Sequence, residues 1–142
     1  MSDDPSYVLV VDSDEGSLGS VAAVLAPLGR PVRGARDAAS ALAAILAGPP
    51  LLVVLAGDRP SLSAIDLARV VRERLGHRAP RILLVSGSAV RRVDLRHVDD
   101  VVRRPYRAEE LVARAKRLVR ASGVWSLRGK EAPRALRRIG PA

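Results

Sequence analysis

The stretch LLVVLAGDRP, residues 51–60, decides the fold that this chain can adopt. Residues 51–55 form a short, unbroken apolar run, which is typical of a strand buried on both faces of a sheet. The glycine, aspartate and proline that follow predict a loop. Comparable runs occur in three further segments: VLVVDSDE at 8–15, ILLVSGS at 82–88 and DDVVRRPY at 99–106. The chain therefore offers several buried strands that lead into polar residues.

The segments between these runs have the features of helices. Apolar residues at helical spacing after residue 15 predict a helix that stops at Gly29 and Pro31. Asp37 is well placed to cap the next helix. Strands are expected at 7–11, 31–36, 51–55, 80–85 and 101–103, and the later helices at 38–47, 63–75, 89–97 and 108–121.

Strict alternation of strand and helix predicts a parallel sheet with helices on both faces. Five such units give an α/β fold with three layers, a doubly wound, five-stranded parallel sheet of the flavodoxin-like type. We expect a flexible N-terminus at 1–6, one domain at 7–122 and a basic C-terminal tail at 123–142. Ligands of such folds bind outside the carboxyl ends of the strands, so the loops at that edge are the expected site.

Composition excludes several classes of protein. The chain has no cysteine, which rules out disulfides, thiol catalysis and zinc-thiolate sites. No apolar run approaches the roughly 18 residues of a membrane span, and no signal peptide opens the chain. The sequence contains no phosphate-binding loop and no zinc motif. We therefore expect a cytoplasmic protein that does not associate with membranes and is not an enzyme.

The net charge of +9 is high for a domain of 142 residues. A GC-rich genome would by itself enrich arginine, whereas the functional alternative is attraction to nucleic acid, anionic lipid or an acidic partner. Residues 123–142 carry five basic residues and Glu131, a net charge of +4. The basic residues of this tail are Arg128, Lys130, Arg134, Arg137 and Arg138.

Together, the four quoted segments resemble the receiver domain of bacterial two-component response regulators, over residues 7–122. The resemblance implies that an aspartate after the third strand accepts a phosphoryl group. It also implies two adjacent acids after the first strand that hold Mg²⁺, a Ser or Thr after the fourth strand and a Lys-Pro pair after the fifth. The hydroxyl contacts the phosphoryl oxygens and the lysine neutralises their charge.

The positions after the first four strands match this pattern only in part. Asp12 matches the first acid, but Ser13 occupies the second position, and Asp14 is expected to begin the following helix. Ala56 occupies the phosphoacceptor position, so the chain has no catalytic residue there. Ser86 matches the hydroxyl residue.

The fifth strand departs from the pattern as well. Arg104-Pro105 replaces Lys-Pro, and Val101 occupies the place of the aromatic residue that turns inward in active receivers. Four residues of the receiver pattern are thus replaced: the phosphoacceptor, the second acid, the lysine and the inward-turning aromatic residue. These replacements indicate that phosphorylation is no longer the input signal of this domain. We expect Asp12 and Arg104 to pair, directly or through water. With one secure carboxylate, Mg²⁺ binding should be weak or absent, and no metal site or cofactor is predicted.

These departures predict a pseudoreceiver, a phosphorylation-independent module that binds another protein or a second copy of itself. The resemblance implies a homodimer face formed by the fourth helix, the fifth strand and the fifth helix, with a two-fold axis. Its acidic residues are Asp94, Asp99, Glu109 and Glu110. Its basic residues are Arg91, Arg92, Arg96, Arg103 and Arg107.

Two alternatives remain open. The tail could bind nucleic acid, with Trp125 stacking on a base and the basic residues meeting phosphates, although Trp125 and Leu127 are expected to fold back on the domain. Asp58, two residues beyond Ala56, could instead be a displaced phosphoacceptor; as a loop residue in a Gly-Asp-Arg-Pro turn it needs no such role.

Overall fold

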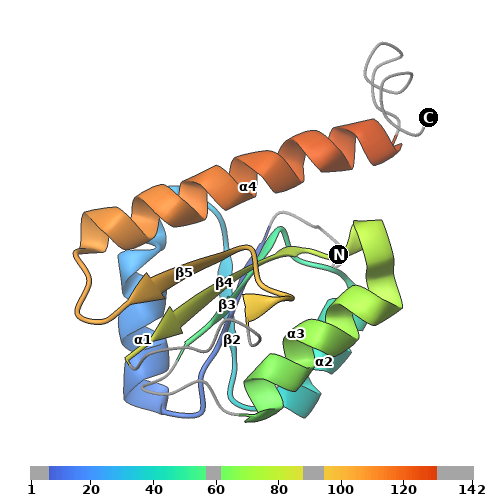
Figure 1. Cartoon of the computed structure of the whole chain (residues 1–142). Helices are drawn as coiled ribbons and strands as arrows, with labels where there is room; N and C mark the ends of the chain where they lie inside the picture. The colour runs from blue at the N-terminus through green and yellow to red at the C-terminus, as the bar shows by residue number, and fades with distance from the viewer. Residues whose placement is uncertain (1–6, 57–61, 88–94, 131–142) are drawn as a thin grey trace.

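The computed structural model describes residues 7–56, 62–87 and 95–130, and it describes the side chains of all of these except 62–63 and 122–130. A five-stranded sheet in the order β2-β1-β3-β4-β5 forms the middle of the molecule, and every neighbouring pair of strands is parallel (Figure 1). The expected doubly wound parallel sheet is confirmed. The strands are β1 (Val8–Val11), β2 (Val32–Ala35), β3 (Leu52–Leu55), β4 (Arg81–Ser86) and β5 (Asp100–Arg103).

Helices cover both faces of this sheet (Figure 1). Successive side chains of a strand point to opposite faces, so β1 supplies Val8 and Val10 to one core and Leu9 to the other. The first core packs against α1 and α4, and the second packs against α2 and α3. The helices are α1 (Glu15–Val24), α2 (Ala38–Ala47), α3 (Leu62–Leu75) and α4 (Ala108–Lys130), with short 3₁₀ turns η1 (Ala26–Leu28) and η2 (Gly76–Arg78).

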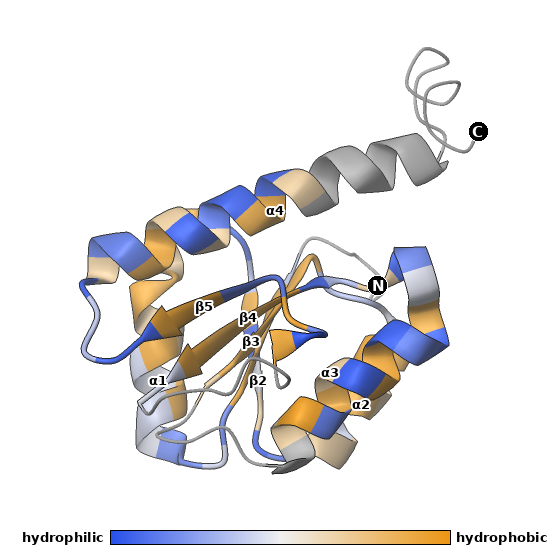
Figure 2. Cartoon of the chain, viewed as in Figure 1, coloured by the Kyte–Doolittle hydropathy of each residue, from blue (hydrophilic) through white to orange (hydrophobic). Residues whose placement is uncertain are grey.

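Aliphatic side chains fill both cores, as a chain without phenylalanine requires. Figure 2 shows apolar residues along the strands and on the sheet-facing sides of the helices, with polar residues outward. Leu9, Leu52, Leu83 and Leu111 are each at most 1% exposed. Burying a leucine side chain stabilises a fold by roughly 1.5–3 kcal/mol. The two cores therefore hold the sheet between its two layers of helices.

Two aspartates cap helices where the sequence places them. The Asp14 carboxylate accepts a hydrogen bond from the Ser17 amide at the start of α1 (3.2 Å). Asp37 accepts one from the Ser40 amide at the start of α2 (2.7 Å). The hydrogen bonds from Ser40 lower the pKa of Asp37, because they stabilise its charged form. Asp14 is therefore committed to the helix terminus, as expected.

The last helix is longer than predicted. We expected it to end at residue 121, but α4 continues to Lys130. Gly123 and Gly129 each weaken a helix by only about 1 kcal/mol, whereas proline stops a helix, and the first proline after the predicted end is Pro133. The basic tail at 123–142 thus begins inside a helix. The expected packing of Trp125 and Leu127 lies outside the described side chains.

The expected helix at 89–97 falls mainly on residues 88–94, which lie outside the described residues. Within the described residues, no helix has the length and apolar character needed to cross a membrane.

Candidate functional site

The carboxyl edge of the sheet brings together the four positions at which the site was expected. Asp12 directly follows β1, Ala56 follows β3, Ser86 ends β4 and Arg104 follows β5. The Ala56 amide donates to the Val11 carbonyl (2.9 Å), and the Arg104 amide donates to the Ser86 carbonyl (2.8 Å). The order of these residues along the edge is therefore Asp12, Ala56, Ser86 and Arg104.

Asp12 is the buried carboxylate of this edge, with 3% of its surface exposed. Its Oδ1 accepts a hydrogen bond from the Asp14 amide (3.0 Å). Its Oδ2 is buried and has no hydrogen-bond partner in the described part of the chain. A half-satisfied carboxylate in a buried position costs stability, because it has given up water without full replacement. Ser13 next to it is exposed and adds no second carboxylate.

Replacing Asp12 with asparagine should raise the free energy of unfolding by about 1 kcal/mol. Asparagine keeps an oxygen that can accept from the Asp14 amide and removes the uncompensated charge. Urea denaturation measures the change. The control is Asp14→Asn, which removes an exposed charge, keeps the cap and should have little effect. A clear loss of stability in Asp12→Asn would show that the Asp12 charge is compensated.

Ala56 places a methyl group at the end of β3. The residue is partly buried and packs against the core shared by α1 and α4. Covalent phosphoryl transfer needs a nucleophilic oxygen, sulfur or nitrogen, and this side chain has none. Asp58, the alternative acceptor, lies outside the described residues.

Arg104 is turned toward α1 and away from a direct pairing with Asp12. Its Nη2 donates to Ser17 Oγ (3.3 Å), and its guanidinium lies 5.9 Å from the centre of the Tyr106 ring. Its Nε is buried without a hydrogen-bond partner in the described residues. The expected direct ion pair between Asp12 and Arg104 is therefore wrong. The long Arg104 side chain instead contacts the Ser17 hydroxyl and lies near the Tyr106 ring. A bridge between Asp12 and Arg104 through water stays a prediction.

The remaining predicted positions lie where the sequence placed them. Ser86 is fully buried at the end of β4, and Pro105 is exposed after a cis peptide bond from Arg104. Val101 in β5 is partly buried and packs against the core shared by α2 and α3. An aliphatic residue there has no ring to turn inward.

A magnesium site of the kind the resemblance implies does not fit these residues. Mg²⁺ is usually held by one or two carboxylates together with phosphate oxygens. Asp12 supplies one carboxylate, Ser13 replaces the second and the Asp14 side chain caps α1. Among the described residues no three His, Cys, Asp or Glu side chains are grouped so that they could hold a metal ion.

The amino edge of β5 contains an arrangement that the sequence did not predict. Asp99 forms ion pairs with Arg72 of α3 and with Arg81 of β4 (3.5 Å for the latter), and it also accepts from the Ile82 amide (2.7 Å). The Arg72 Nε further donates to the carbonyl of His97 (3.1 Å). The sequence predicted Asp99 only as an acidic residue of the interaction face. Two neighbouring acids before a strand were the available signal.

Asp100 repeats this arrangement on the other face of the sheet. Arg114 of α4 donates to both oxygens of Asp100 (2.8 and 2.9 Å) and also approaches Glu110 (3.5 Å). The hydrogen bond to Asp100 raises the pKa of Arg114, because it stabilises the charged guanidinium. The predicted interaction face thus has Glu110, like Asp99, engaged within the chain. Arg96, Arg103 and Arg107 of this face are exposed, whereas Arg91 and Arg92 lie outside the described residues.

Comparison with known proteins places the fold. No family model and no curated protein matches the chain. Among solved structures it is similar to a CheY-like response regulator receiver domain from Methanospirillum hungatei JF-1, with a TM-score of 0.72 and 20% identity over 83% of this chain and 96% of that one. The receiver domain of NtrX from Brucella abortus gives a TM-score of 0.70 and 28% identity, over 80% of this chain and 98% of that one. A putative two-component response regulator with a GGDEF domain gives 0.71 and 28%, over 85% of this chain and 51% of that one. The chain therefore has the fold of response regulator receiver domains.

Proposed function

We propose that this chain is a pseudoreceiver, a signalling module with the receiver fold that acts without being phosphorylated. The observation that carries the proposal is the methyl group of Ala56 at the end of β3, in line with Asp12, Ser86 and Arg104. A phosphoacceptor position without a nucleophilic atom cannot form an acyl phosphate, whatever the other residues of the edge are.

The neighbours of Ala56 support the same proposal. Arg104, which occupies the position of the lysine that the resemblance implies, donates to Ser17. Val101 cannot report on the pocket by moving a ring toward it. A domain with these features keeps one surface conformation. Its signalling is then regulated by the presence or absence of its partner.

A second protein in a bacterial two-component or related cytoplasmic pathway is the partner we propose. The exposed arginines Arg96, Arg103 and Arg107 favour an acidic surface on that protein. A second copy of this chain is the weaker candidate, since Asp99 and Glu110 already pair within the chain and would have to be released. No catalytic role is assigned to any residue.

Phosphorylation by a small donor tests the proposal. The full chain, incubated with acetyl phosphate and Mg²⁺, should show no phosphoryl adduct by intact-mass spectrometry, because Ala56 offers no oxygen. The control is the same experiment on Asp58→Asn. An adduct on the native chain that Asp58→Asn abolishes would replace this proposal with a receiver that uses a displaced acceptor. An adduct that survives in that variant would contradict both.

A further inference from the structure

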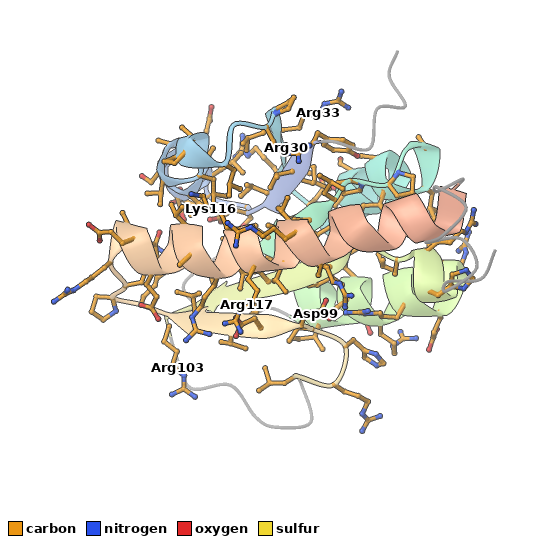
Figure 3. All side chains as sticks on the ribbon, turned by 90° about the horizontal axis from the view of Figure 1, so that it is seen from above. Arg30, Arg33, Asp99, Arg103, Lys116 and Arg117 are labelled. Atoms are coloured by element: carbon orange, nitrogen blue, oxygen red, sulfur yellow. The ribbon has the colours of Figure 1, made fainter. Side chains whose placement is uncertain are left out.

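One flank of α4 carries basic side chains that the fold does not use. Arg114 pairs with Asp100 of β5, which fixes the side of the helix that faces β5. Lys116 and Arg120 are exposed, one turn apart, and lie on the opposite flank, where α4 packs beside α1 and η1. Figure 3 shows Lys116 on the side of Arg30 and Arg33, and Arg117 on the side of β5.

Arg30 extends this flank beyond η1, where its side chain is exposed. Arg33 of β2 does not belong to the flank, because it lies in register with Leu9 and its guanidinium is 4.3 Å from the centre of the Tyr7 ring, on the face of the sheet covered by α2 and α3. We call Arg30, Lys116 and Arg120 the basic flank.

Acidic side chains do not neutralise the basic flank. None of the ion pairs formed by the described residues involves any of its three members. The acids of α1 and α4 lie in or just before the first turns of these helices, at the carboxyl edge, where Asp14 caps α1 and Glu110 approaches Arg114. Three positive charges without counter-charges create a field that attracts anions.

The surroundings of the basic flank favour a phosphate backbone over a protein. Protein interfaces depend on apolar and aromatic anchors, and phosphate contacts do not. The one large apolar side chain exposed in the described part is Leu46, which belongs to α2 on the other face of the sheet. Small residues of the outer side of α1 (Gly16, Gly19, Ser20 and Ala23) leave a surface without bulky side chains beside α4.

The aromatic residues favour a duplex over a single strand. Single-stranded nucleic acid is held largely by stacking of its bases on exposed aromatic rings. Tyr7 is 2% exposed and covered by Arg33, and Tyr106 is partly buried beside Arg104 at the other edge. The described surface thus supplies charge without a stacking platform.

We propose that the basic flank binds the phosphate backbone of double-stranded nucleic acid without reading its base sequence. Arginine guanidinium groups can donate two parallel hydrogen bonds to one phosphate, and Lys116 adds a mobile charge. This site differs from the tail in which the sequence located nucleic-acid binding, because all three residues belong to the folded domain. It is independent of whether the carboxyl edge is phosphorylated.

Salt dependence of binding tests this inference. Each phosphate contact contributes about −0.9 to the slope of log affinity against log salt. The full chain with a duplex DNA should therefore give a slope of about −3 between roughly 50 and 200 mM salt. The triple variant Arg30→Gln, Lys116→Gln and Arg120→Gln should lose most of that slope and bind at least about tenfold more weakly at the lower salt. Arg33 is kept because it lies on the other face of the sheet.

A matched control removes the same charge elsewhere. The control is a triple variant in which three exposed arginines outside the basic flank are replaced: Arg96→Gln, Arg103→Gln and Arg107→Gln. It should bind the duplex nearly as tightly as the native chain does. A loss equal to that of the first variant would overturn the inference, since net charge alone would explain binding. A third triple variant changes the tail: Arg134→Gln, Arg137→Gln and Arg138→Gln. If duplex binding were lost only in this variant, the site would lie in the tail and not on the basic flank. Stronger binding to phosphatidylserine vesicles than to the duplex, or no duplex binding, would equally overturn it.

Discussion

Replacing Asp99 with alanine is expected to lower the free energy of unfolding by about 3 kcal/mol. The Asp99 side chain is 16% exposed and ties three elements together, because it pairs with Arg72 of α3 and accepts from the backbone of β4. Its removal would leave the Ile82 amide without this acceptor. It would also leave the Arg72 guanidinium without its carboxylate, and the Arg72 side chain is only 28% exposed. Breaking a largely buried pair by removing one partner is far more costly than losing a surface ion pair.

Two further variants separate the contributions. Asp99→Asn keeps an oxygen for the Ile82 amide and removes the charge, so it should cost about half as much. Asp100→Ala breaks the more exposed pair with Arg114, whose side chain is 36% exposed, and should cost about 1 kcal/mol. Urea denaturation at neutral pH gives all three values. Equal losses in Asp99→Ala and Asp100→Ala would show that Asp99 has no special role in holding β5.

Restoring the acid at the end of β3 is expected to destabilise the protein and to leave it unswitched. Ala56→Asp places a carboxylate beside the buried Asp12, whose Oδ2 already lacks a partner in the described residues. Like charges at such a distance raise the pKa of a carboxyl group, and the folded state should lose about 1–2 kcal/mol. Arg104 offers little compensation while it donates to Ser17.

The charge, and not the size, of the new side chain should cause this loss. Ala56→Asn has nearly the same volume without the charge, and it should be the more stable of the two variants. Mg²⁺ should recover part of the stability of Ala56→Asp, because it binds the native state between two carboxylates. Thermal unfolding with and without Mg²⁺ measures both effects. Equal melting temperatures of the two variants, unaffected by Mg²⁺, would show that Asp12 is not close to position 56.

The sequence predicted the fold well because the strands are buried on both faces. Unbroken runs such as residues 8–11 and 52–55 can be satisfied only inside a parallel sheet, and the intervening helices are bounded by local signals such as Asp37. The end of α4 was missed because the glycines that follow the predicted end at residue 121 are tolerated in a helix.

The candidate site was predictable in its residue types but not in its contacts. Asp12, Ala56, Ser86 and Arg104 follow from the ends of strands, which the pattern fixes. The direction of the Arg104 side chain depends on Ser17, which is 87 residues away in the chain and comes close only once α1 packs beside α4. The pairing of Asp99 with Arg72 depends in the same way on α3. Sequence spacing contains no information about either choice.

The claim that this chain is not switched by phosphorylation can be tested directly with a phosphoryl mimic. Beryllofluoride with Mg²⁺ is added to the ¹⁵N-labelled full chain, and the amide resonances of Ser86 and Arg104 are followed by NMR. We predict no shift beyond that caused by Mg²⁺ alone, because Ala56 has no oxygen to hold the mimic. Saturable shifts at Ser86 and Arg104 in the native chain would contradict the account.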